Sequence, residues 1–335
     1  MSYCIGKLQE IVVSVTNLKR HLETWHDYMG WQIRYQGRLD GDILKFWHVS
    51  LSTHGAETLC AFPNAQHGLL RLVKFDGVEQ QQIRGGAQIW EPGGIFDFDL
   101  HVSDVQATFR EMVHQLGWFS YGEPIEFSLG AVTVQEALLY GPDRVALALV
   151  HRVSPPMQPL PTTLPEPQVT TTAATTVRTL GSVYLSMMVA ENLPTSLEFF
   201  VKTLGFHLQD NTSFVLPSNA PNVFRLPWNL AESHPVRFVT LSPDNTRDTM
   251  LGLFHFEGLQ GKHYAERAVP PNTGLLMYRF AVSNIAEYYQ AVVGRGVSPV
   301  STLAEVVLRP YGKAQAFAVR SPDGVWIEFF ELLNA

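Results

Sequence analysis

The hydrophobic pattern near the end of the chain predicts a turn followed by a strand. Residues 321–324 read Ser-Pro-Asp-Gly, in which proline restricts φ and glycine tolerates positive φ, so a tight turn is expected. In residues 325–330, Val, Ile and Phe fall on one face of the strand, and Trp, Glu and Phe fall on the other. Glu328 is the one acidic residue of this apolar segment, and a carboxylate is costly to bury unless it is paired or protonated.

The same pattern occurs earlier in the chain, which indicates an internal repeat. Residues 141–150 again contain Pro-Asp, followed by Val and an alternating apolar segment. Helix signals recur as well: Asn17 lies 13 residues before Gly30, and Asp104 lies 13 residues before Gly117. The two later equivalents of these helix-capping residues are Asn192 and Asn284.

Each repeat predicts one strand, one helix and three further strands, so we expect four βαβββ modules. Residues 153–177 interrupt the pattern with six prolines and a Thr/Ala-rich run, a composition typical of an extended linker. The sequence therefore predicts an α+β fold with two domains, residues 1–152 and 178–335, each built from two consecutive modules.

Composition and charge narrow the function classes. The 335 residues are 46% hydrophobic, which suits two globular domains, and the net charge of −7 argues against nucleic acid or an anionic membrane surface as a partner. No apolar run reaches the roughly 18 residues that span a bilayer. The N-terminus shows no signal-peptide pattern, and the two cysteines, Cys4 and Cys60, suit a reducing compartment. We therefore expect a cytoplasmic protein.

Four modules with Asn or Asp before a helix, Gly-aromatic after it and a final Ser-Pro-Asp-Gly-x-x-Ile-Glu-Phe resemble the vicinal oxygen chelate superfamily. This group includes the glyoxalases, the bleomycin-resistance proteins and the type I extradiol dioxygenases. The resemblance covers the chain except its linker, and the two-domain arrangement is most similar to the extradiol dioxygenases. It implies that each pair of modules forms a cup in which first and last strands bind a divalent metal. The superfamily hosts unrelated chemistries, so function must be argued from the site residues.

The positions that carry metal ligands in that family hold an unusual set of residues here. They are Glu10, Arg71, Asp97 and Ala148 in the N-terminal domain, and Tyr184 (Leu185 by strict counting), Gly252, Met277 and Glu328 in the C-terminal domain. An extradiol dioxygenase resembles a two-His, one-carboxylate iron site, whereas an arginine would repel a divalent cation. We therefore expect no metal and no other cofactor, with iron or another divalent metal as the alternative.

Glu328 is the leading candidate for chemistry. A carboxyl group in an apolar cup without a metal is expected to have a raised pKa, as a general acid or base needs. Arg279 and Tyr184 share the proposed inner face and would polarise a bound carbonyl or phenol oxygen. The alternative is that Glu328 and Arg279 form a structural ion pair. The residues expected to line the same substrate site are Met277, Trp326, Tyr311 and His255.

A second charged set is expected in the N-terminal cup. Glu10, Arg71 and Asp97 would form a buried cluster in which Arg71 bridges two carboxylates and fills a former metal site. The alternative is a second ligand pocket.

Three functions follow from these residues and from the resemblance. The first is a metal-independent isomerase, lyase or cyclase that transfers protons on a small apolar molecule with a carbonyl or phenol group. The second is an iron-dependent ring-cleaving dioxygenase with atypical ligands. The third is a non-catalytic small-molecule binder of the resistance type. All three imply a small-molecule partner, and all three are compatible with a homo-oligomer.

Overall fold

Each of the four predicted modules is present as a strand, a helix and three further strands in the computed structural model, which describes residues 3–156, 178–217 and 219–333. Module one comprises β1 (Cys4–Ser14), α1 (Leu18–Leu22) continued by the π-helix η1 (Glu23–Tyr28), β2 (Gln32–Arg38), α2 (Gly41–Phe46), β3 (His54–Ala61) and β4 (Leu69–Asp76). Module two comprises β5 (Ile95–His101), α3 (Val105–Leu116), β6 (Ile125–Leu129), β7 (Val132–Tyr140), the 3-10 turn η2 (Pro142–Arg144) and β8 (Ala146–Ser154).

The second half of the chain repeats this order. Module three comprises β9 (Leu185–Val189), α4 (Leu193–Leu197) continued by η3 (Glu198–Thr203), β10 (His207–Phe214), α5 (Trp228–Ala231), β11 (Val236–Ser242) and β12 (Met250–Phe256). After the short turn η4 (Ala265–Arg267), module four comprises β13 (Gly274–Ser283), α6 (Ile285–Gly294), β14 (Ser301–Leu308), β15 (Gly312–Arg320) and β16 (Trp326–Leu332). No helix in the described part of the chain is both long and apolar enough to cross a membrane. Most of the predicted linker, residues 157–177, lies outside the described residues.

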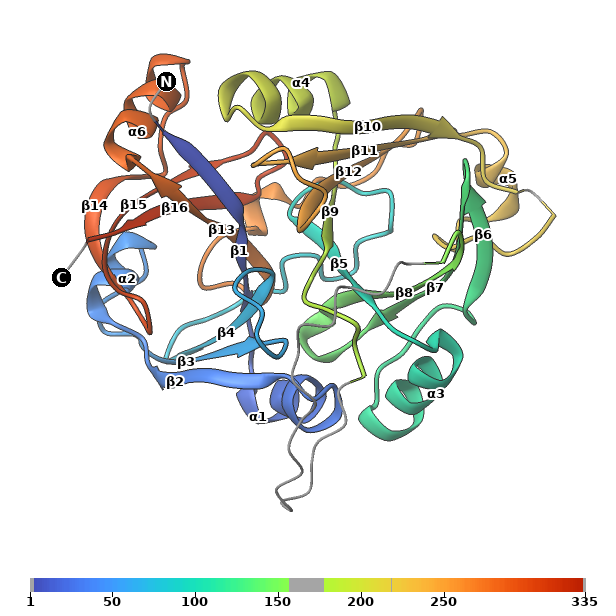
Figure 1. Cartoon of the computed structure of the whole chain (residues 1–335), viewed down its shortest axis with the longest axis horizontal. Helices are drawn as coiled ribbons and strands as arrows, with labels where there is room; N and C mark the ends of the chain where they lie inside the picture. The colour runs from blue at the N-terminus through green and yellow to red at the C-terminus, as the bar shows by residue number, and fades with distance from the viewer. Residues whose placement is uncertain (1–2, 157–177, 218, 334–335) are drawn as a thin grey trace.

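The modules pair in a different way from the prediction. One eight-stranded sheet has the order β14-β15-β16-β13-β1-β4-β3-β2 and joins modules one and four, whereas the other, β10-β11-β12-β9-β5-β8-β7-β6, joins modules two and three. Figure 1 shows the first sheet on the left and the second on the right. The prediction that consecutive modules form each cup, with 1–152 and 178–335 as self-contained domains, is therefore wrong.

The central strands explain this pairing. β1 pairs antiparallel with β13, which places Glu10 opposite Arg279, and β5 pairs antiparallel with β9, which places Asp97 opposite Met187. Module spacing along the chain does not select the partner of a central strand. The entropy of closing a long loop grows only slowly with its length, so a distant module can pair as well as a neighbouring one.

The side chains of β1 alternate between the two faces of its sheet. Ile11, Val13 and Val15 pack in the main hydrophobic core, whereas Val12 packs on the opposite, cup side of the sheet. The main core joins the helix-covered faces of both sheets: Trp25 of η1 contacts Phe98 of the second sheet at 5.6 Å between ring centroids. The two sheets therefore share one core and curve away from it, each around its own cup.

Two aspartates of the predicted turns connect consecutive modules. Asp143 accepts hydrogen bonds from the Thr16 backbone N–H at 2.9 Å and from the Thr16 hydroxyl at 2.8 Å, and it contacts His21 Nε2 at 3.0 Å. Asp323 likewise accepts from the Glu191 N–H at 2.9 Å and the Ser196 hydroxyl at 2.6 Å. Each aspartate thus holds the helix start of the preceding module, so every module is bonded to one partner through its sheet and to another through this turn.

We predict that residues 1–156 and 178–335, expressed separately, do not fold cooperatively, because the first fragment lacks β13 and β9 and the second lacks their partners β1 and β5. Mixing or co-expressing the two fragments should restore a folded complex with the sheets of the intact chain. Circular dichroism, urea unfolding and light scattering of the fragments and of their mixture would measure this. Two monomeric fragments that each unfold cooperatively would contradict the pairing of module one with module four.

Candidate functional site

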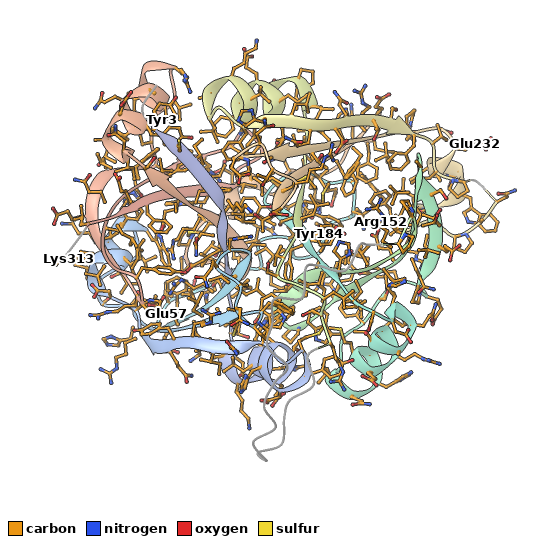
Figure 2. All side chains as sticks on the ribbon, in the orientation of Figure 1. Tyr3, Glu57, Arg152, Tyr184, Glu232 and Lys313 are labelled. Atoms are coloured by element: carbon orange, nitrogen blue, oxygen red, sulfur yellow. The ribbon has the colours of Figure 1, made fainter. Side chains whose placement is uncertain are left out.

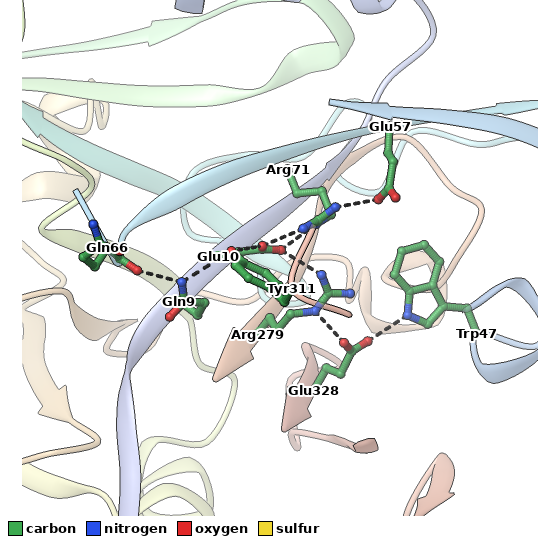
Figure 3. Close-up of polar contacts among 9 residues, drawn as sticks. All are labelled: Gln9, Glu10, Trp47, Glu57, Gln66, Arg71, Arg279, Tyr311 and Glu328. Atoms are coloured by element: carbon green, nitrogen blue, oxygen red, sulfur yellow. Dashed lines mark hydrogen bonds and ion pairs between the residues drawn. The ribbon is translucent and has the colours of Figure 1, made fainter. Parts of the chain in front are cut away.

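The cup formed by modules one and four contains a continuous ladder of buried charges. Arg71 donates from Nε and Nη2 to the two carboxylate oxygens of Glu10, at 2.6 and 2.7 Å, and from Nη1 to Glu57 at 2.6 Å. Arg279 donates to Glu10 at 2.7 Å and to Glu328 at 2.5 Å. Figure 3 shows the resulting order Glu57–Arg71–Glu10–Arg279–Glu328, which we call the charge ladder.

Aromatic residues complete the ladder. The Trp47 indole N–H, at the end of α2, donates to the second oxygen of Glu328 at 2.8 Å, and the Tyr311 hydroxyl donates to Glu10 at 2.7 Å. Each guanidinium also lies 5.9 Å from the centroid of one of these rings, Arg71 over Tyr311 and Arg279 over Trp47. The charges of the first cup are therefore satisfied by residues of the chain itself.

The electrostatics at the centre of the ladder favour the ionised forms of Glu10, Arg71 and Arg279. Glu10, Arg71, Arg279 and Glu328 are all at most 1% exposed. Burial alone would raise the pKa of Glu10, but Arg71 and Arg279 outweigh it and lower that pKa to about 2. The same pairing raises the pKa of both arginines despite their burial.

The first cup is also filled by apolar side chains. Buried residues of the strands and of α2 form one cluster on this side of the sheet, and its members include Val12, Leu44, Val73, Met277, Trp326 and Phe330. The α2 segment is bound to the far edge of the sheet by the Ser301 hydroxyl, which donates to the Phe46 carbonyl at 2.5 Å. The interior of this cup is therefore filled by packed side chains.

The residues at the family's metal positions do not fit a divalent cation in this cup. Of these positions, Glu10 lies on β1, Arg71 on β4, Met277 on β13 and Glu328 on β16. Arg71 carries a permanent positive charge and no lone pair, and the neighbouring Arg279 already pairs with both Glu10 and Glu328. Across the described residues, no group of three or more His, Cys, Asp or Glu side chains is arranged to hold a metal ion.

The structure separates residues that the sequence analysis grouped together. Glu328 and Arg279 do lie side by side, but Tyr184 belongs to the other sheet, so the predicted trio is wrong. Glu10 and Arg71 are bridged as expected, whereas Asp97 is in the other sheet and Glu57 takes its place. Figure 2 shows Glu57 and Tyr184 in different halves of the molecule.

The predicted lining residues divide in the same way. Met277, Trp326 and Tyr311 lie in the first cup, as expected, but they pack around paired charges. The predicted position of His255 in this site is wrong: it lies on β12 of the second sheet, where Nδ1 contacts the Ala190 carbonyl at 3.0 Å. Both oxygens of Glu328 accept hydrogen bonds, one from Arg279 and one from Trp47, which agrees with the alternative that Glu328 and Arg279 form a structural ion pair.

The cup formed by modules two and three encloses a cavity of about 320 Å³. Its wall is mainly apolar and rich in phenylalanine. The aromatic residues that line it are Phe96, Phe127, Tyr184, Phe214, Phe224, Phe238 and Phe254. Phe224 comes from the segment between β10 and β11 and packs on Phe254 at 4.8 Å between ring centroids. This segment corresponds to the α2 segment of module one, but it leaves the cup open inside.

Three carboxyl groups line this cavity: Asp97 and Asp99 on β5, and Glu136 on β7. Within the described residues, no Lys or Arg forms an ion pair with any of them. Burial and the neighbouring carboxyls raise the pKa of Asp97 and Asp99 well above the ordinary range, and burial raises the pKa of Glu136 to about 7. The three groups therefore share protons at neutral pH.

Neutral polar groups flank the carboxyls. The Tyr184 hydroxyl donates to Asp99 Oδ2 at 3.4 Å, and its ring stacks on His101 at 3.8 Å between centroids. Burial and the nearby Arg152 lower the pKa of His101 to about 4, so this imidazole is neutral at pH 7. Four buried polar atoms of lining residues have no hydrogen-bond partner: Asp97 Oδ1, Asp99 Oδ1, His101 Nδ1 and Arg152 Nε. Unsatisfied groups concentrated at one cavity indicate a ligand site.

Sequence reasoning noted Asp97 but missed Glu136 and Arg152. One signal was available for Glu136, because Val132, Val134, Glu136 and Leu138 alternate along one strand and all line the cavity. The Phe224 wall had no comparable signal, since it comes from an irregular segment.

Comparison with known proteins agrees with this architecture. Residues 182–329 match the family model described as "Glyoxalase/Bleomycin resistance protein/Dioxygenase superfamily". The crystal structure of glyoxalase I from Zea mays aligns with a TM-score of 0.62 at 14% identity, covering 98% of this chain and 93% of that chain. A putative dioxygenase from Bacillus subtilis subsp. subtilis str. 168 aligns with a TM-score of 0.59 at 10% identity, covering 98% and 86%. Among curated proteins, none matches the sequence. The structural similarities show the fold.

We predict that Arg71→Met lowers the free energy of unfolding by about 3–5 kcal/mol, because it leaves Glu10 and Glu57 buried with fewer donors. Urea unfolding at pH 7 would measure the difference, with Arg38→Met on the exposed strand β2 as the matched control. A loss of less than 1 kcal/mol would contradict a structural role of the ladder.

We also predict that stability falls as the pH rises from about 5 to about 8. The carboxyls of the cavity have higher pKa values in the folded chain than the value near 4 of the unfolded chain. In this window the unfolded state binds fewer protons than the folded state, so raising the pH favours unfolding until the folded-state carboxyls have ionised.

Glu136→Gln should flatten this decline in the free energy of unfolding, because glutamine does not ionise. We expect a difference on the order of 2 kcal/mol, since the partial exposure of Glu136 reduces the effect of its pKa shift. Urea unfolding at four pH values between 5 and 8 would test it, with the exposed Glu126→Gln as control. Parallel pH profiles for the wild type and Glu136→Gln would show that Glu136 is not protonated in the folded protein.

Proposed function

We propose that this chain, of which residues 182–329 match the glyoxalase/bleomycin resistance protein/dioxygenase superfamily model, is a small-molecule enzyme whose site is the cavity between modules two and three. It transfers protons to or from its substrate by carboxyl chemistry and requires no metal for this step. The observation that carries the proposal is the set of three carboxyls, unpaired with any described Lys or Arg, in the lining of a mainly apolar cavity.

These carboxyls have the properties that acid–base catalysis needs. A general acid or base works best when its pKa is close to the working pH. Burial raises the pKa of Glu136 to about 7. Asp99 accepts a hydrogen bond from Tyr184, which supports its ionised form. In this arrangement one carboxylate would remove a proton from carbon or oxygen, a neighbouring protonated carboxyl would return it, and the Tyr184 hydroxyl would donate to a carbonyl or phenolate oxygen.

An iron-dependent dioxygenase is less consistent with these residues. The positions equivalent to the first cup's Arg71 and Glu328 are Gly252 and Ala148, which offer no ligand atoms, and the donor set lacks the two histidines of a facial triad. A non-catalytic binder remains the second candidate, because the aromatic wall formed by Phe214, Phe224 and Phe254 would hold an apolar ligand whether or not chemistry follows. A cytoplasmic location and a homo-oligomer remain predictions.

The proposal predicts proton exchange that depends on the cavity. We expect the protein to speed the exchange of acidic C–H protons for deuterium in at least one member of a panel of aryl ketones and phenols. Asp99→Asn and Glu136→Gln should each slow that exchange by about 100-fold or more, the range of a general acid–base contribution. Proton NMR in D2O at pD 7 would follow the reaction.

Two controls give this test its meaning. Glu126→Gln, which lies on the exposed side of β6, should exchange at the wild-type rate, and thermal unfolding would verify that all variants are folded. Exchange that is unchanged in Asp99→Asn and Glu136→Gln would remove these residues from the mechanism. Binding without exchange, measured by calorimetry with the same panel, would favour the non-catalytic binder.

A further inference from the structure

Buried carboxyl groups form ion pairs in the first cup of this protein but not in the second. In the first cup, Glu10, Glu57 and Glu328 face two guanidinium groups, and each guanidinium also faces an aromatic ring at 5.9 Å. In the second cup, three carboxyls and a wall of phenylalanine rings are present, but no guanidinium or ammonium group of the described residues pairs with the carboxyls.

The module repeat shows which residues stand in the second cup at the positions of the first cup's arginines. Counting from the helix-capping residues, Arg279 corresponds to Asp99, and the overlay of β4 on β12 places Gly252 where module one has Arg71. Ala148 corresponds to Glu328 and is equally small. The side chains that fill and neutralise the first cup are therefore missing from the second, and the cavity is the space that remains.

We propose that the ligand of this cavity is an organic cation, an ammonium or similar basic nitrogen attached to an apolar or aromatic group. The proposal rests on the proposed function only in taking this cavity as the ligand site. The cation would occupy the place of the missing guanidinium groups, beside Asp99 and Glu136, and its apolar part would lie against Phe224 and Phe254.

Two physical effects favour such a ligand. A charge-assisted hydrogen bond or ion pair satisfies buried carboxyl oxygens, and two of these, Asp97 Oδ1 and Asp99 Oδ1, have no partner. Aromatic faces attract cations when water is excluded, and Phe238 and Phe254 lie 5.4 Å apart on the wall, with Phe224 next to Phe254. The volume of about 320 Å³ suits a molecule of one or two rings.

Other titratable groups around the cavity determine whether acidic or basic side chains are in excess there. The titratable residues that face it are Asp97, Asp99 and His101 on β5, Glu136 on β7, Arg152 on β8, Tyr184 before β9 and Asp210 on β10. His101 is neutral, and Asp210 is paired with Arg247 and Thr240. Arg84, whose guanidinium stacks on Phe96 and donates to the Gly93 and Glu91 carbonyls, lies near Asp97 without pairing with it. Three carboxyls thus face one cation, Arg152, so the cavity has an excess of acid.

A cation that binds to protonated carboxyls must displace protons. If the ligand is a quaternary ammonium, which has no proton to lose, every proton released on binding comes from the protein. A neutral ligand of the same shape would release none. Proton release therefore separates recognition of charge from ordinary hydrophobic binding.

The experiment compares three probes of one shape: trimethyl(3-phenylpropyl)ammonium, 3-phenylpropan-1-ol and 3-phenylpropionate. Calorimetry of the full-length protein at pH 6.5, in two buffers that differ in ionisation enthalpy, measures affinity and proton release together. We expect the ammonium to bind at least tenfold more tightly than the alcohol, with release of a fraction of a proton, and the propionate to bind most weakly. Affinity for the ammonium should rise between pH 5.5 and pH 7.5.

Variants test the position of the cation. Glu136→Gln should reduce ammonium affinity at least tenfold and weaken its pH dependence, whereas the exposed Glu126→Gln should change neither. Val134→Lys would place a permanent cation on the same face of β7, next to Glu136. It should abolish ammonium binding and raise the thermal midpoint at pH 8 relative to the volume-matched Val134→Met.

Equal affinity of the ammonium and the alcohol, or tightest binding of the propionate, would overturn the inference and leave the cavity as a ligand site. Lack of binding by all three probes, with the wild type folded, would overturn the inference together with the proposed location of the site.

Discussion

The pairing of Glu10 with Arg279 is the contact on which the arrangement of this protein depends. It lies at the centre of an antiparallel pair of strands that joins the first module to the last, across almost the whole chain. A buried ion pair of this kind is tolerated only if nearly every oxygen and N–H has a partner, and the ladder from Glu57 to Glu328 supplies these partners. Once β1 is committed to β13, module two has only module three as its partner.

One repeated scaffold therefore yields two different interiors. In the first cup, charged side chains from five strands pack with large aromatic side chains into a closed structure. In the second, small residues at equivalent positions leave a cavity whose three carboxyls form no ion pair with a Lys or Arg of the described residues. The first cup thus maintains the fold, while the second retains unsatisfied polar groups, which are costly for stability and are maintained where they serve a ligand.

The two interiors also respond in opposite ways to pH. Glu10 has a lowered pKa and contributes stability that is lost only in strong acid, whereas the carboxyls of the cavity have raised pKa values and oppose folding as they ionise. Their effects act in separate pH windows, so the protein is expected to be most stable at mildly acidic pH. Around neutrality, the protonation of the cavity depends on what occupies it.

The sequence alone determined the modules and much of their inner chemistry. Capping residues such as Asn17 and Asp104 start helices, Pro-Asp turns precede final strands, and alternation places Glu10 and Glu328 on cup faces, because these features depend on neighbours within one strand or turn. The pairing of modules was decided only by the tertiary structure, since hydrogen bonding between central strands is non-local and a long loop hardly constrains it. For the same reason, the sequence could not show that Arg279 pairs with Glu10, nor that Tyr184 lines the same cavity as Asp99 and Glu136. Those contacts join modules whose adjacency no local pattern encodes.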